Sequence, residues 1–83
     1  MDKILIGLYV PAVQEHFDLF VPGTQKIELI IRLMTEGVAD LCKGRFTPSG
    51  FEMLSLKDGD ILLHPERTLA DYGIDDGAQL LLM

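Results

Sequence analysis

Apolar residues alternate with other residues along the first part of the chain and then change to a helical spacing. Within residues 3–12, every second position from Ile4 to Val10 is a branched apolar residue, and apolar residues alternate in a similar way in residues 15–21. Alternation of this kind predicts two strands, each with one face toward the core. The core-facing sets are Ile4, Ile6, Leu8 and Val10 in the first strand and Phe17, Leu19 and Val21 in the second. With only residues 11–14 between them, the two strands predict an antiparallel hairpin.

The next segment has the period of an α-helix. Its expected core-facing set is Ile27, Ile30, Ile31, Met34, Val38 and Leu41, at spacings of one to four positions. We expect Thr24 to cap the first turn with its hydroxyl. Lys43 and Gly44 predict the end, a cation near the negative pole followed by a left-handed glycine. Gly37 is the expected weak point, because glycine costs a helix interior about 1 kcal/mol relative to alanine. It is the position at which a break in the helix is expected, if one occurs.

Turn signals divide the remaining sequence into shorter elements. We expect a loop at 45–50, a strand at 51–56, a turn at 57–60, a strand at 61–63, a compact connection at 64–77 and a last strand at 78–83. In the strand at 51–56, Leu54 and Leu56 are predicted to face the core, and Met53 and Ser55 to face away. A single helix has to cover one face of the sheet, which predicts a two-layer α+β domain with four to five strands in a mixed sheet.

Length and charge limit the possible functions. The 83 residues suffice for one modest core, so residues 1–83 are expected to form one domain. Thirteen acidic residues against seven basic ones give a net charge of −6. That charge disfavours binding to nucleic acid or to an anionic membrane surface, and it favours a partner with a basic surface.

Motifs for catalysis and metal binding are missing from the sequence. Cys42 is the single cysteine, and His16 and His64 are far apart in the chain, so we expect no disulfide and no metal site. No phosphate-binding glycine loop or nucleophile motif occurs, which predicts a non-enzyme without a cofactor.

Targeting signals are also missing. No segment reaches the about 18 apolar residues of a membrane span. The apolar stretch at 4–13 lacks a cleavage site. We therefore expect a cytoplasmic protein without a signal peptide.

Two aspartate pairs, Asp58/Asp60 and Asp75/Asp76, lie beside glycines. Aspartate is common in turns because its carboxylate bonds nearby backbone groups, and we interpret the four residues in this way. An alternative is that they form an acidic surface that binds a basic partner.

The segment Arg67-Thr68-Leu69-Ala70-Asp71-Tyr72-Gly73-Ile74 resembles the ubiquitin segment R-T-L-S-D-Y-N-I at six of eight positions. This resemblance implies a ubiquitin-like β-grasp fold, with Leu63, Leu80 and Leu82 in the core. Leu69 and Ile74 are expected to pack into the core beneath the connection at 64–77. The Tyr72 hydroxyl is expected to bond the backbone near His64 or Pro65, since a buried phenol without a partner costs about 1–3 kcal/mol; the alternative is a tyrosine exposed in a loop.

The segment at 73–82 resembles more narrowly the I-x-D-G-D-x-L-x-L close of the EsaB/YukD family. These are small ubiquitin-like accessory proteins of type VII secretion systems in Gram-positive bacteria. Ala78 departs from the pattern, because the family often has a polar residue there.

Ubiquitin and the sulfur carriers act through a flexible tail that ends in paired glycines. This sequence ends at Leu82-Met83, so we expect neither conjugation nor sulfur transfer. Function is then expected on the sheet face that the helix leaves free. The candidate partner-binding residues on that face are Leu5, Tyr9, Phe20, Met53, Leu81 and Met83. Leu5, Tyr9, Leu81 and Met83 are predicted to adjoin, with Met53 beside the last strand.

These observations together predict a non-conjugating adaptor of a type VII secretion system that acts by protein binding. The expected partner is a membrane-associated secretion component or its ATPase, which would recruit the protein to the inner face of the cell membrane. Three alternatives remain open at this point. The first alternative is a truncated modifier or sulfur carrier. The second is an acidic interaction module unrelated to secretion, and the third is a homodimer formed through the free sheet face.

Overall fold

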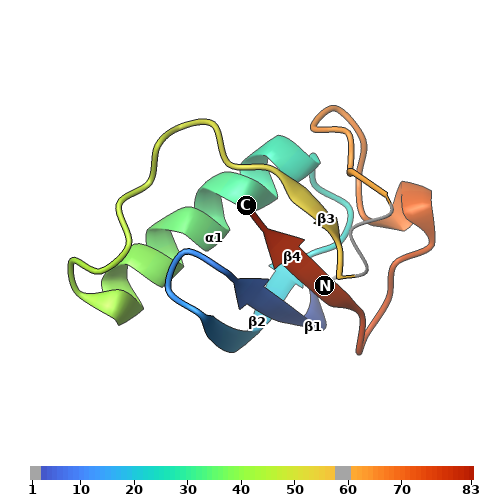
Figure 1. The fold of residues 1–83 in the computed structure, drawn as a ribbon. Coiled ribbons are helices and arrows are strands. Elements are labelled where there is room, and N and C mark those ends of the chain that lie inside the picture. The colour runs from blue at the N-terminus through green and yellow to red at the C-terminus, as the bar shows by residue number, and fades with distance from the viewer. Residues whose placement is uncertain (1–2, 58–60) are drawn as a thin grey trace.

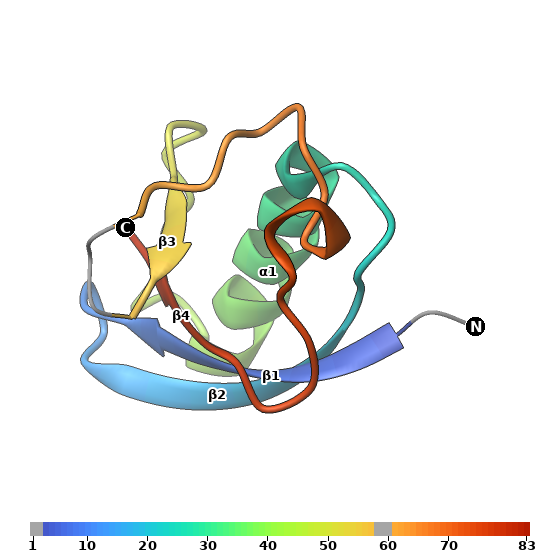
Figure 2. The same ribbon diagram turned by 90° about the vertical axis from the view of Figure 1, so that its right-hand side faces the viewer.

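The computed structural model describes residues 3–57 and 61–83. Its elements, in chain order, are β1 (Lys3–Val10), β2 (Glu15–Pro22), α1 (Ile27–Cys42), β3 (Leu54–Leu56), a short 3-10 helix η1 (Ala70–Tyr72) and β4 (Gln79–Leu82). The four strands form one sheet in the order β2-β1-β4-β3. β1 and β4 are parallel, and the other two pairs are antiparallel. α1 lies across one face of this sheet (Figures 1 and 2), which confirms the predicted two-layer α+β architecture with a mixed sheet.

β1 and β2 form the predicted antiparallel hairpin. Its register places Ile6 opposite Leu19 and Leu8 opposite Phe17, so the alternating apolar sets of the two strands share the face toward α1. Ile6, Leu8 and Val10 are fully buried. Gln14, in the turn between the strands, has a positive φ of 54°.

The helix is continuous through Gly37, so no break occurs at this expected weak point. A Cβ at Gly37 would meet nothing within 4 Å, and the buried Met34 and Val38 anchor the helix on either side of it. The prediction for Leu41 is wrong. Leu41 is 62% exposed, because the core side of the last turn is occupied by the buried Cys42.

The start of α1 differs from the predicted cap, whereas its end is the predicted Lys43-Gly44. Lys26, not Thr24, is the N-cap residue, and its side chain makes no capping hydrogen bond. Backbone carbonyls of the distant connection replace a side-chain cap, since Ile27 donates to the Arg67 oxygen at 2.7 Å and Glu28 to the Pro65 oxygen at 3.0 Å. At the other end, the left-handed conformation begins at Lys43 with φ 46° and continues at Gly44 with φ 96°.

The strands predicted at 51–56 and 61–63 are shorter in the structure. β3 covers only three residues, and the second segment forms a single bridge between Ser55 and Leu62. Two backbone hydrogen bonds flank this bridge, from Leu56 to the Ile61 oxygen at 3.1 Å and from Leu63 to the Leu54 oxygen at 2.8 Å. Residues 58–60 of the predicted turn at 57–60 lie outside the described residues.

The core lies between the sheet and α1. Its buried apolar residues are Ile6, Leu8, Val10, Val21, Ile27, Ile30, Met34, Val38, Cys42, Phe46, Leu54, Leu63, Leu69, Leu80 and Leu82. The prediction that Leu63, Leu69, Leu80 and Leu82 are core residues is therefore confirmed.

The connection at 64–77 is held against the rest of the fold by the residues that the sequence predicted. Leu69 is buried, and Ile74 packs against the core while half-buried. The backbone N–H of His64 donates to the Tyr72 hydroxyl at 2.9 Å, which confirms the predicted hydrogen bond, but the side chain is 38% exposed and not buried.

Candidate functional site

The candidate residues of the sequence lie on the sheet face opposite α1, which we call the open face. Pairing partners in a sheet point to the same side, so the register shows which side chains are neighbours. Leu5 lies opposite Phe20 and Tyr9 lies opposite His16 in the hairpin. Tyr9 is also paired with Leu81 of β4.

One row of the open face crosses three strands and continues into the bridge. Tyr9, Leu81 and Ser55 are successive partners along β1, β4 and β3, and Leu62 is the bridge partner of Ser55. Ser55 was predicted to face away from the core and is on that side, yet it is only 1% exposed. Its small side chain lies between two leucines, so it is covered by its neighbours.

The next row contains two methionines. Met53 and Met83 donate backbone hydrogen bonds to each other's carbonyl oxygens, at 2.8 and 2.9 Å. This mutual pair extends the β3–β4 ladder by one step. The side chains of Met53 and Met83 are 48% and 52% exposed. We call this apolar surface the docking cluster; its residues are Tyr9, Met53, Leu62, Leu81 and Met83.

Leu5 and Phe20 form a separate pair, so the prediction that Leu5 adjoins Tyr9, Leu81 and Met83 is wrong. Leu5 and Tyr9 are four residues apart on one strand, about 13 Å at the usual rise. Gly7 lies between them, with Asp18 and Gln79 as its partners on either side. The Gln79 side chain lies so close over Gly7 that a Cβ there would be 2.5 Å from its Oε1 atom.

Two residues of the open face, His16 beside the docking cluster and Leu62 within it, were not among the sequence candidates. The ring of His16 contacts the ring of Tyr9 with centroids 4.6 Å apart. Leu62 joins the face through a single bridge, which is too short to show an alternating pattern in sequence. The only sequence signal for His16 was its position in the outward set of the second strand.

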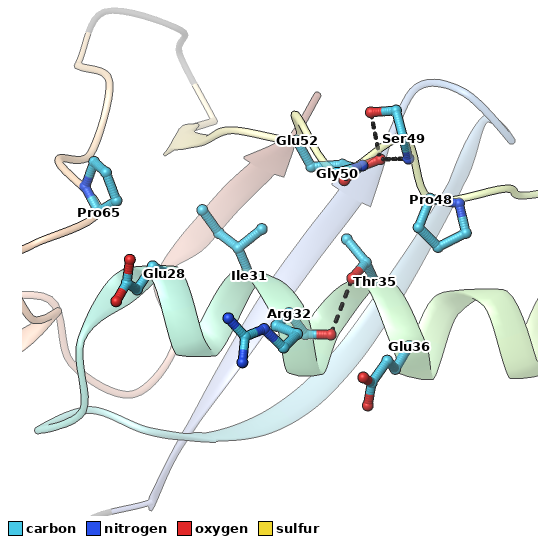
Figure 3. A pocket seen from close by; sticks show the side chains of 10 residues that line it. All are labelled: Glu28, Ile31, Arg32, Thr35, Glu36, Pro48, Ser49, Gly50, Glu52 and Pro65. Carbon is cyan, nitrogen blue, oxygen red and sulfur yellow. Dashed lines mark hydrogen bonds between the residues drawn. The ribbon is translucent and has the colours of Figure 1, made fainter.

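The sequence analysis also did not predict a groove in the helix layer of the fold. It lies between α1 and the segment at 48–52, with a volume of about 660 Å³, and Figure 3 shows the side chains along it. Its lining residues are Glu28, Ile31, Arg32, Thr35, Glu36, Pro48, Ser49, Gly50, Glu52 and Pro65.

Glu52 fixes one wall of this groove. Its carboxylate accepts hydrogen bonds from the backbone N–H of Ser49 at 2.5 Å and of Gly50 at 3.1 Å, and from the Ser49 hydroxyl at 3.0 Å. Partial burial raises the pKa of Glu52, but these hydrogen bonds outweigh it and the pKa is lowered from its usual value. Glu52 thus holds the loop rather than facing a ligand with free oxygens.

The aspartates at 75 and 76 also serve the backbone. The Asp75 carboxylate accepts from the N–H of Asp76 at 2.8 Å. The Asp76 carboxylate accepts from the N–H of Leu5 at 2.7 Å, and so it joins the last turn to β1. This agrees with the interpretation of the pair as backbone-bonding residues. Asp58 and Asp60 lie outside the described residues.

The described part of the chain contains no group of three or more His, Cys, Asp or Glu residues that would hold a metal ion. Cys42 is free and buried. Among residues 3–57 and 61–83, no helix has the length and apolar character needed to cross a membrane.

Comparison with known proteins gives structural neighbours only. No protein-family model and no curated protein sequence matches the chain. The fold is similar to the ubiquitin-like domain of EccD5 from Mycobacterium xenopi, with a TM-score of 0.85 and 18% identity over 100% of this chain and 94% of that one.

The ubiquitin-like domain of the type VII secretion system protein EccD1 from Mycobacterium tuberculosis is also similar. Its TM-score is 0.76 at 18% identity, over 100% of this chain and 99% of that one. A ubiquitin-like domain from Arabidopsis thaliana gives a TM-score of 0.74 and 20% identity, over 100% and 78% of the two chains. The chain therefore has a ubiquitin-like fold, as the sequence predicted.

Proposed function

We propose that this protein is a ubiquitin-like adaptor of a bacterial type VII secretion system and that it acts by binding a protein partner, without conjugation. The proposed partner is a membrane-associated component of the system or its ATPase. In this role the protein works in the cytoplasm and is recruited to the inner face of the cell membrane.

The observation that carries the binding role is the docking cluster. β1, β4 and the Ser55–Leu62 bridge place Tyr9, Leu81 and Leu62 in one continuous row. The paired Met53 and Met83 form the next row. Contiguous apolar side chains on a face that no described element covers are typical of protein interaction sites, and methionine adapts its shape to different partners.

The link to secretion has two sources of support. The segment at 73–82 resembles the EsaB/YukD family of type VII accessory proteins. The ubiquitin-like domains of EccD1 and EccD5 have the same fold over the whole described length. A fold hosts many functions, so the secretion role is the part of the proposal that needs direct biochemical testing.

The charge of the protein supports a partner with a basic surface. A net charge of −6 speeds encounter with a positively charged surface and slows encounter with acidic ones. In this arrangement the apolar cluster supplies most of the affinity, while the net negative charge of the protein raises the rate of association.

The proposal is tested by capture from the native host, with cross-linking and identification of the bound proteins by mass spectrometry. We expect the wild-type protein to capture a type VII component. The double variant Met53→Asp/Met83→Asp removes the exposed apolar surface of the second row and is expected to lose that capture. Leu41→Asp places the same charge on an exposed apolar residue of α1 and is expected to retain it.

Two results would contradict the proposal. One is that no secretion component is found with the wild-type protein. The other is that both variants capture the component equally well while their amide NMR spectra show an intact fold. Mass spectrometry of the protein from the same cells also tests the absence of conjugation, because a covalent adduct would add the mass of a second protein.

A further inference from the structure

β2 lies at the edge of the sheet and pairs only with β1 within the described residues. The hydrogen bonds of β1 show which of its backbone groups point to which neighbour. Gly7 donates to the Ala78 oxygen at 2.9 Å, and Leu5 accepts from the Gly77 N–H at 2.8 Å. The odd-numbered residues of β1 thus direct their backbone groups toward β4, and the even-numbered ones toward β2.

The same alternation fixes the outer edge of β2. The even-numbered residues of β1 pair with odd-numbered residues of β2, such as Ile6 with Leu19. The backbone N–H and C=O groups of His16, Asp18 and Phe20 therefore point outward, away from the sheet. No other described residue forms a hydrogen bond with these groups. They form a row of free donors and acceptors along the edge.

Apolar side chains border this row on the layer of α1. Phe17 and Leu19 face that layer but remain half-exposed, because β2 has no outer neighbour to cover them. Leu33 of α1 is 45% exposed. It points about 160° around the helix from Ile31, which lines the groove on the β3 side. Leu33 therefore lies on the flank toward β2.

On the open face, the edge carries three side chains: His16, the acidic Asp18 and the apolar Phe20. Phe20 is 69% exposed. No lysine, arginine or histidine of the described residues lies within ion-pair distance of Asp18. Glu15, on the side of α1 with its partner Val10, forms an ion pair with Arg45. An added strand would thus meet apolar neighbours at Phe17, Leu19 and Phe20, and one negative charge at Asp18.

We propose that the outer edge of β2 binds an extended segment of a partner protein as a fifth, antiparallel strand. The segment is apolar and β-branched, with one lysine or arginine opposite Asp18. Backbone hydrogen bonds to His16, Asp18 and Phe20 hold it in register. This edge is distinct from the docking cluster, so the inference does not depend on the proposed function.

A second copy of the chain fits this edge less well than such a segment. Antiparallel pairing of two β2 strands with the open faces on the same side places Asp18 opposite Asp18, Phe20 or His16. In each arrangement the two aspartates are either directly opposite or diagonal neighbours on one face, between two chains that each carry a net charge of −6. Like charges across neighbouring strands destabilise a pair, so charge complementarity selects a basic segment.

The test uses the synthetic peptide acetyl-Ser-Val-Ile-Lys-Ile-Thr-Ser-amide with the intact protein. Its lysine lies opposite Asp18 when its isoleucines face Phe17 and Leu19. We expect addition of the peptide to slow amide hydrogen exchange at His16, Asp18 and Phe20, which exchange rapidly in the free protein. Replacing the peptide lysine by glutamate is expected to weaken binding about threefold or more.

Two peptides with N-methyl groups test the backbone contacts without changing the protein. Methylation of the backbone nitrogen of the peptide lysine removes a donor that faces β2, and we expect binding to weaken roughly tenfold. Methylation of the backbone nitrogens of the two isoleucines changes only donors that face away from β2, and it should leave binding nearly unchanged.

Protein variants complete the test. Asp18→Pro removes the outward N–H without removing a β1–β2 hydrogen bond and is expected to abolish peptide binding, whereas Asp18→Asn retains the N–H and weakens binding about threefold. Protection of open-face residues instead of the β2 amides would overturn the proposal. Equal binding of both methylated peptides, or a concentration-dependent dimer that protects these amides without peptide, would also overturn it.

Discussion

The Gln79 side chain lies directly over Gly7, close enough that a Cβ on Gly7 would be 2.5 Å from its Oε1 atom. The Gln79 amide also donates to the Gly77 oxygen at 3.4 Å. This contact divides the open face, because a polar side chain crosses the sheet between Leu5 and Tyr9. The docking cluster is therefore limited to the half of the face formed by β4, β3 and the end of β1.

Gly7→Ala tests how firmly Gln79 is held. The added methyl group meets the far end of a flexible side chain, so Gln79 can rotate away. We expect a change of less than about 1 kcal/mol in the free energy of unfolding, measured in urea. Nuclear Overhauser contacts from Gln79 should move away from residue 7. A loss above about 2 kcal/mol, not relieved by adding Gln79→Ala, would show that the position of Gln79 is rigid.

Tyr72→Phe removes the hydroxyl that accepts the His64 N–H at 2.9 Å. We expect the free energy of unfolding to fall by about 1 kcal/mol, the usual net contribution of such a hydrogen bond. Tyr9→Phe is the matched control, since no described group hydrogen-bonds its hydroxyl. Equal effects of the two substitutions in urea unfolding would mean that the Tyr72 bond does not fasten the connection.

Leu80→Ala tests the core, and Leu33→Ala serves as its surface counterpart. Leu80 is fully buried in a central strand, whereas Leu33 is 45% exposed on α1. Truncation of the buried leucine is expected to cost about 2–5 kcal/mol of unfolding free energy. The helix-surface change should stay within about 0.5 kcal/mol. Similar losses at both positions would contradict the two-layer packing.

Glu52→Gln tests the loop that forms the groove wall. The folded state lowers the pKa of Glu52, so the ionised carboxylate stabilises the fold above its unfolded pKa of about 4.3. That stabilisation is lost as the pH falls through the folded pKa. We expect the wild-type protein to be more stable than the variant at pH 7 and the difference to shrink below pH 4. A difference that does not depend on pH would contradict this role.

Local patterns were sufficient to predict most of the fold. The alternation in β1 and β2 identified the core faces correctly, and the helical period identified α1 over nearly its full length. The Tyr72 anchor followed from a resemblance together with the cost of burying a phenol without a partner. These features depend on residues close together in the sequence or on a strongly specific motif.

Features that depend on distant contacts were not predicted correctly. The first turn of α1 is capped by carbonyls of Pro65 and Arg67, so the nearby hydroxyl of Thr24 is not needed. Burial of Ser55 follows from its neighbours Leu81 and Leu62 in a register that the sequence does not specify. The separation of Leu5 from the docking cluster follows from its distance to Tyr9 along β1 and from the register that places Gln79 beside Gly7.

The central claim is that the docking cluster on the open face binds the protein partner. It is tested most directly by the affinity of the purified secretion component, measured by titration calorimetry, for the wild-type protein, Leu81→Asp and Leu41→Asp. Amide NMR spectra of each variant establish that it is folded, and Met53→Asp/Met83→Asp replaces Leu81→Asp if the latter unfolds. We predict that affinity falls at least about tenfold when the cluster is changed and is unchanged for Leu41→Asp. Equal affinities for all the folded variants would contradict the account.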